Sequence, residues 1–369
     1  MSTSQSSDPL TQLEAFLQQD PTNNGLRAEA YEVALRSGQH SRAWAHVQAG
    51  MSSGAQRQDW QLKAAHLHIA EHQWRESHEL LSLLLAETAT PALVAAIQHD
   101  LAYVALRTGE LEKGVQGILP LLRASQVASE TQALGLRLLH HTDRLDEALA
   151  FARRWDQSQS LSADAAGVAS LAALDAGATT ESRLWSEAAL RQMPRHLEAL
   201  VCRASLMLLD RDADRAIALA TSALEVSPED GRAWSAVGFA QMLAGDLGTA
   251  RASLEKATRF MPAHIGTWHG LGWVLLLSGD PTSALAVFQH ALSLDRNFAE
   301  SHGGLAVVQA RMGDRASAEE NVAIALRLDR QSMSAQYARA LLDGQGSDAD
   351  HIRRLAQRLL EARFRMQSQ

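Results

Sequence analysis

The chain has 369 residues and a formal net charge of −8, and 46% of its residues are hydrophobic while only 5% are aromatic. The acidic balance argues against general nucleic-acid binding, because that binding needs a basic surface to displace counterions from phosphates. No secretory signal and no uninterrupted apolar run of about 18 residues is visible. With its single cysteine, Cys202, the chain is expected to be a cytoplasmic protein without a disulfide or an integral membrane segment.

The predicted elements begin with a lone helix over residues 8–19, inside an N-terminal tail and capping segment that covers 1–23. A pattern with a period of 34 residues follows. Its first two copies, within 24–91, are degenerate, and the earliest keeps Ala30, Tyr31, Gly38 and Ala43. Three extra residues at 92–94 then shift the register. Three more degenerate copies cover 95–196, so their shared spacing matters more than any single match.

Residues 197–332 carry the pattern most clearly. At the 34-residue period the following pairs align: Trp234 with Trp268, Gly238 with Gly272, Gly245 with Gly279, and Asp246 with Asp280. Small or apolar residues at positions 4, 7, 8 and 11 of each copy form one stripe of a helix. Glycine at position 15 ends that helix, and a second stripe at positions 20, 24 and 27 predicts another helix after it.

These residues and spacings resemble the tetratricopeptide repeat signature of Trp, Leu-Gly, Tyr, Ala, Phe, Ala and Pro. The resemblance covers about five-sixths of the chain. It implies an all-α fold, a right-handed α-solenoid of about nine helix-turn-helix repeats with terminal capping helices. Residues 333–369 are expected to supply the C-terminal capping helices. The last of these is expected over about 350–366, after a capping box formed by Ser347 and Asp350.

Motifs that carry catalytic chemistry are missing from the sequence. It has no G-x-S-x-G, no Walker sequence and no dinucleotide-binding glycine motif. His68 and His72 have the i, i+4 spacing of a metal-binding pair, but no further ligand cluster joins them, and both fall at positions of packing or helix termination. We therefore expect no enzyme activity, no cofactor and no metal, and we expect Cys202 to be structural.

In tetratricopeptide proteins the first helix of each repeat lines a concave groove, through positions 5, 9, 12 and 13. In this chain those positions are apolar in the well-formed repeats, and the predicted partner-binding residues are Val201, Leu208, Ser235, Phe239, Met242, His269, Trp273 and Leu276. Such a stripe either binds an amphipathic helix or is buried against the neighbouring repeat. A second, polar groove is predicted from His99, Tyr103, Arg107 and Arg137, with ordinary solvated surface as its alternative.

The leading functional hypothesis is a non-catalytic scaffold or adaptor that binds a peptide or amphipathic helix of a protein partner in its groove. Lysine is rare in the chain and arginine is common, which is typical of GC-rich bacterial genomes. Stand-alone bacterial repeats of this kind resemble accessory proteins of secretion, pilus or envelope-assembly systems. The alternative is a regulatory sensor that binds a small molecule or signalling peptide. The sequence leaves the oligomeric state open, a homodimer included.

Overall fold

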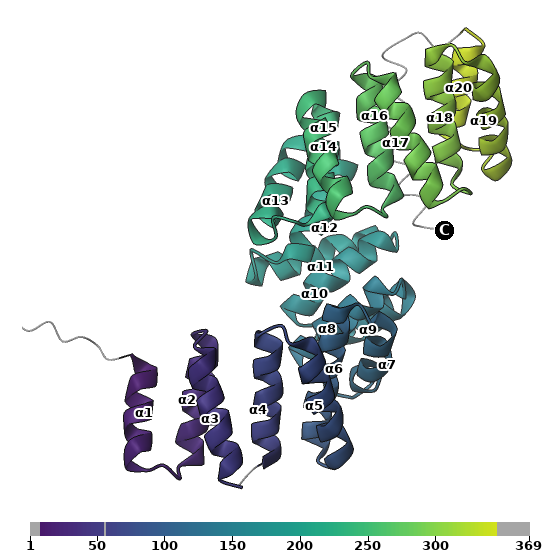
Figure 1. The fold of residues 1–369 in the computed structure, drawn as a ribbon. Helices are drawn as coiled ribbons and strands as arrows, with labels where there is room; N and C mark the ends of the chain where they lie inside the picture. The colour runs from purple at the N-terminus through teal and green to yellow at the C-terminus, as the bar shows by residue number, and fades with distance from the viewer. Residues whose placement is uncertain (1–7, 55–56, 345–369) are drawn as a thin grey trace, which may run out of the picture. The chain divides into compact units, whose positions relative to one another are not determined.

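The computed structural model describes residues 8–54 and 57–344. Within these ranges the chain forms twenty helices, α1 to α20, and no strand (Figure 1). The expected all-α repeat fold is therefore confirmed for the described residues. The capping helix expected over about 350–366, with its Ser347–Asp350 box, lies outside them.

The chain divides into two compact units, residues 1–144 (unit 1) and 145–369 (unit 2). Unit 1 begins with α1, which occupies the place of the expected N-terminal capping helix, and Asp8 caps it by accepting a hydrogen bond from the backbone N–H of Leu10. The helices of unit 1 are α1 (Pro9–Gln19), α2 (Asn24–Arg36), α3 (His40–Ser52), α4 (Arg57–Ala70), α5 (Trp74–Glu87), α6 (Pro91–Thr108), α7 (Leu111–Leu122) and α8 (Ser129–His141).

Unit 2 continues the alternation of first and second helices. From α10 onward the even-numbered helices are the first helices of their repeats and the odd-numbered ones are the second helices. The helices are α9 (Leu145–Gln157), α10 (Ala163–Asp175), α11 (Thr179–Gln192), α12 (Leu197–Leu209), α13 (Ala213–Val226), α14 (Gly231–Ala244), α15 (Leu247–Phe260), α16 (Ile265–Leu277), α17 (Pro281–Leu294), α18 (Ala299–Met312), α19 (Arg315–Leu328) and α20 (Met333–Leu342).

The turn between the two helices of each repeat has one backbone conformation throughout. Position 15 has a positive φ at Gly38, His72, Gly109, Asp143, Gly177, Arg211, Gly245, Gly279 and Gly313. A left-handed residue at this place ends the first helix and reverses the chain, and glycine adopts the conformation at no steric cost. The register is the same on both sides of the three extra residues at 92–94. Those residues lie in the first turn of α6, which is longer than its counterparts at 18 residues.

Aspartate follows this turn in the well-formed repeats and starts the second helix. Asp246, Asp280 and Asp314 each accept a hydrogen bond from the backbone N–H three residues later, at 3.1–3.2 Å. This N-cap satisfies a donor that the first turn of the helix would otherwise leave unpaired. The Gly-Asp pair therefore ends one helix and begins the next.

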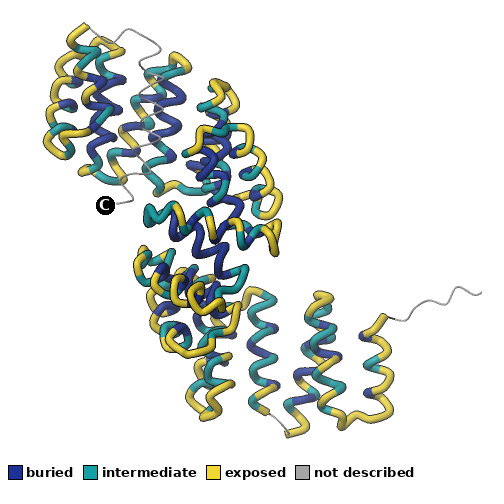
Figure 2. The backbone as a smooth tube through the Cα atoms, turned by 180° about the vertical axis from the view of Figure 1, so that it is seen from behind, coloured by how far each residue is buried: buried dark blue, intermediate teal, exposed yellow. Residues whose placement is uncertain are grey.

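Small residues allow the helices of unit 2 to approach closely. Ala216, Ala250, Ala284 and Ala318, all at position 20, are 0% exposed. A Cβ atom added at Gly304 would lie 2.4 Å from Cε1 of Phe288, closer than any real contact allows. The apolar core runs through successive repeats from Leu171 to Ala338. Figure 2 shows the buried stretches inside the stack and the exposed ones at turns and outer helices.

Candidate interaction face

The apolar residues predicted to bind a partner lie together in unit 2. Val201, Leu208, Phe239, Trp273 and Leu276 all belong to one cluster of packed side chains. We call the flank of α12, α14 and α16 that carries them the first-helix face. These side chains are buried in the folded chain, at 2–8% exposed, while Met242 of α14 is half-buried and packs against the same cluster.

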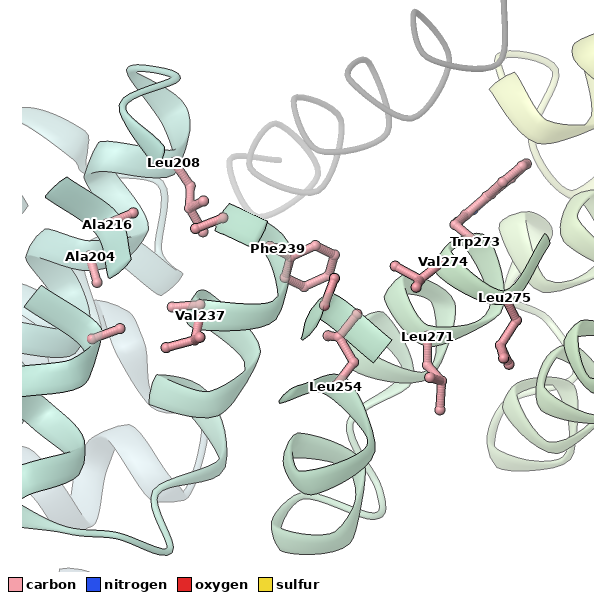
Figure 3. Close-up of a cluster of buried hydrophobic side chains, with 14 of the residues drawn as sticks. Ala204, Leu208, Ala216, Val237, Phe239, Leu254, Leu271, Trp273, Val274 and Leu275 are labelled. Atoms are coloured by element: carbon pink, nitrogen blue, oxygen red, sulfur yellow. The ribbon is translucent and has the colours of Figure 1, made fainter. Parts of the chain in front are cut away.

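An aromatic pair marks the middle of the first-helix face. The ring of Phe239 covers Gly270 on the next first helix, because a Cβ there would lie 2.6 Å from Cζ of Phe239. Trp273 contacts Phe288 of α17 edge to face, with ring centroids 5.8 Å apart. In Figure 3, Trp273 extends from α16 on the side opposite to Leu271 and Leu275. Aromatic side chains in such a position provide large apolar area for packing.

Two of the predicted binding residues are polar, and both are bonded to the following repeat. The hydroxyls of Ser235 and Thr267 lie 3.3 Å apart, and Nε2 of His269 lies 2.8 Å from Oγ of Ser301. The His269 ring also lies against Phe288 and Phe298. Burial lowers the pKa of His269 to about 3, because desolvation disfavours the imidazolium. Position 5 of these two repeats therefore joins successive first helices.

The α10–α12 end of this surface is acidic. Asp164 and Glu198 contact the two ring nitrogens of His196, at 2.9 Å and 3.5 Å. Asp175, the last residue of α10, forms an ion pair with Arg232 of α14 at 2.7 Å. Asp164 and Glu198 thus flank His196, while Asp175, at the other end of α10, pairs with Arg232. The apolar part of the face and this acidic end lie in the same unit.

The polar residues predicted in unit 1 fall into two places. His99 of α6 lies 3.0 Å from the hydroxyl of Thr131, and burial lowers its pKa. Tyr103 and Arg107 instead lie around Trp74. The Tyr103 and Trp74 ring centroids are 6.4 Å apart, and the guanidinium of Arg107 lies 5.6 Å from the Trp74 ring. Arg137, on α8, is half-buried.

The groove positions lie on first helices, so they do not include Trp74, which begins the second helix α5. It lines an open hollow of about 520 Å³ with Val104, His78 and Lys113. The feature of the sequence that could have indicated this site is a tryptophan two residues after His72, the left-handed turn residue. The hollow also contains the ion pair between Lys113 and Glu110, so its charges are largely balanced.

The two histidines considered as a metal pair have other contacts. Nδ1 of His68 lies 2.6 Å from Oε1 of Gln73, and the His68 ring packs against Trp44. His72 is the turn residue beside Trp74. In the described part of the chain, no three histidine, cysteine or acidic residues are placed to hold one metal ion. Within that same part, every helix is too short or too polar to cross a membrane.

The helical-hairpin architecture belongs to the class of repeat proteins that serve as interaction scaffolds. A tetratricopeptide repeat family model matches residues 275–342, from the end of α16 through α20. This part of the chain therefore carries tetratricopeptide repeats, as the sequence resemblance implied. Repeats of this family generally act as non-catalytic modules for protein–protein interaction. No curated protein sequence matches the chain.

Several solved structures are similar to this chain. One is the APC/C hetero-tetramer Cut9–Hcn1, at 13% identity over 94% of this chain and 81% of that chain, with a TM-score of 0.46. Another is YrrB, described as a TPR protein with an unusual peptide-binding site, at 16% identity over 61% of this chain and 98% of that one (TM-score 0.37). A third is a tetratricopeptide repeat protein from Parabacteroides merdae, at 13% identity, 78% and 98% coverage, and a TM-score of 0.37.

Proposed function

We propose that the chain is a scaffold that binds an amphipathic helix of a protein partner along the first-helix face of unit 2. The observation that carries the proposal is the row of large apolar side chains on successive first helices, with Phe239 and Trp273 at its centre. Aromatic and methionine side chains are typical anchors of protein interfaces. A helix with apolar residues on one side would bury that side on α12, α14 and α16.

The burial of this row has a consequence for how binding proceeds. Phe239 and Trp273 are only 5% and 4% exposed in the folded chain, so a partner cannot add to an open surface there. It has to replace contacts that already cover the two rings. Half-buried Met242, at the edge of the same cluster, is the residue that a partner would reach first.

The arginine-rich, lysine-poor composition supports a bacterial setting, in which we propose an accessory role in secretion, pilus or envelope assembly.

The test is affinity capture from the native cell with matched surface variants. Met242→Glu places a charge at the edge of the face, and Leu294→Glu places one on the second helix α17, where the side chain is 38% exposed. We expect specific partners to stay bound at high salt, since apolar contacts are not screened. Met242→Glu should lose them and Leu294→Glu should keep them, with both variants melting near the wild-type temperature. Equal capture by both variants would refute the proposed face.

A further inference from the structure

We propose that, without a partner, the first-helix face of unit 2 is covered by the chain's own C-terminal segment, residues 345–369. The inference rests on the proposed function, because the segment would occupy the same face that a partner helix uses. It gives the scaffold an intramolecular competitor, and therefore a resting state in which partners bind weakly.

Helix α16 buries many more of its residues than the second helix α17 does. The side chains of residues 269–276 are all buried, whereas the second helix α17 buries only Ala284, Phe288 and Ala291. The described helices packed against α16 are its neighbours along the stack, α14, α15, α17 and α18. Trp273 points away from Leu271 and Leu275 (Figure 3) and is still only 4% exposed. The edge-to-face contact with Phe288 of α17 covers part of the indole, and a covering layer in front of the first helices would account for the rest.

The C-terminal segment can be compared in length with the face that it would cover. The described chain ends at Gly344, directly after α20, the last first helix of the stack. About 25 residues follow it. In helical form they would extend roughly 37 Å, at about 1.5 Å per residue. Neighbouring packed helices lie roughly 8–10 Å apart, so the four spacings from α20 to α12 amount to roughly 32–40 Å. The segment is long enough to cross the whole face.

The composition of the C-terminal segment is complementary to the first-helix face and its acidic end. Ile352, Leu355 and Leu359 have the spacing that places apolar residues on one side of a helix. Between and after them come the five arginines of the segment: Arg353, Arg354, Arg358, Arg363 and Arg365. A chain that returns from α20 meets the apolar part of the face first and the α10–α12 end last. The last two arginines would then reach the acidic end formed by Asp164, Asp175 and Glu198.

A tethered ligand of this kind competes strongly with a free one. A short flexible connection gives the segment an effective concentration in the millimolar range. The apparent affinity for a partner falls by the fraction of chains in which the face is open. A partner helix therefore needs either higher intrinsic affinity or a second contact that removes the segment.

The experiment measures the accessibility of the face in the full chain, with no partner present. A thiol is introduced by Leu276→Cys and its rate of maleimide labelling is measured, while native Cys202, which is 0% exposed, stays unreactive. Leu355→Asp with Leu359→Asp in the same chain should increase the rate about tenfold or more, because the face opens. Leu184→Cys, at an exposed position of α11, should label at one rate in both backgrounds. An unchanged rate at Leu276→Cys would overturn the proposal.

Two further measurements use the same labelled chain. Arg363→Glu with Arg365→Glu should also increase labelling, and high salt should increase it in the parent chain, since both weaken attraction to the acidic end. If a second copy of the chain covered the face instead, labelling would accelerate on dilution, and that result would also overturn the proposal. Partner capture that depends on Met242 while labelling ignores the C-terminal substitutions would leave the proposed function standing and refute only this inference.

Discussion

Nε2 of His269 lies 2.8 Å from Oγ of Ser301, which is 32 residues further along the chain. The same step joins the hydroxyls of Ser235 and Thr267 in unit 2, and in unit 1 it joins Nδ1 of His99 to the hydroxyl of Thr131. Each pair connects position 5 of one first helix to position 3 of the next. Because these groups are buried or half-buried, the bonds fix the register between repeats.

Stability should fall in acid through His269. Its pKa is about 3 in the folded chain and about 6.5 when unfolded, so below pH 6.5 the unfolded chain binds a proton that the folded chain does not. The free energy of unfolding should drop by about 1.4 kcal/mol for each pH unit between roughly 6.5 and 3 from this group alone. Urea titrations of the wild type and His269→Phe at pH 7, 6 and 5 measure the difference. A gap between the two proteins that does not change with pH would contradict the assignment.

Gly304→Ala should destabilise unit 2, although alanine favours helices. Its Cβ would lie 2.4 Å from Cε1 of Phe288, a fully buried ring that Gly272 also contacts. Overpacking costs about 1–3 kcal/mol, more than the roughly 0.5–1 kcal/mol that alanine gains over glycine in a helix. Gly117→Ala in α7 is the matched control, since nothing lies within 4 Å of its added Cβ, and it should be neutral or stabilising. Thermal melts of both variants decide the point.

Glu300→Gln should loosen the end of the described stack. The buried carboxylate of Glu300 accepts hydrogen bonds from the backbone N–H groups of Met333 and Ser334, at 2.9 Å and 3.2 Å, and from the Ser334 hydroxyl. These contacts hold the first turn of α20, and losing the charge should cost about 1–3 kcal/mol. Amide hydrogen exchange should accelerate over residues 333–342. The exposed Glu319→Gln, which breaks an i, i+4 pair with Arg315, should leave those rates unchanged.

Cys202 should react with thiol reagents only when unit 2 opens. Its side chain is 0% exposed, its Sγ lies 3.0 Å from Oγ of Ser182, and burial raises its pKa. Thiolate is the reactive form, so both access and ionisation are suppressed. Labelling in native buffer should be slow and should rise steeply across the urea transition of unit 2. Fast native labelling would show that α12 opens locally.

The repeat and its register could be predicted from the sequence, because both depend on local chemistry. A left-handed position 15, an aspartate cap after it and small residues at position 20 are each set by steric fit or a hydrogen bond within one hairpin. The three extra residues at 92–94 do not change the position of the turn, because they lengthen α6 at its start. The surroundings of Trp74 could not be predicted in this way, because its contacts with Tyr103 and Arg107 come from the next repeat.

The amino-acid pattern by itself determined that this chain forms tetratricopeptide hairpins and where each one turns. Only the tertiary structure decided what the groove positions do: His269 and Ser235 bond to the next repeat, and Phe239 and Trp273 are buried. The physical reason is the separation along the chain between the residues that pack together. A helix stripe specifies which residues lie on one side, but the exposure of that side depends on neighbours 32 or more residues away, whose placement no local pattern records.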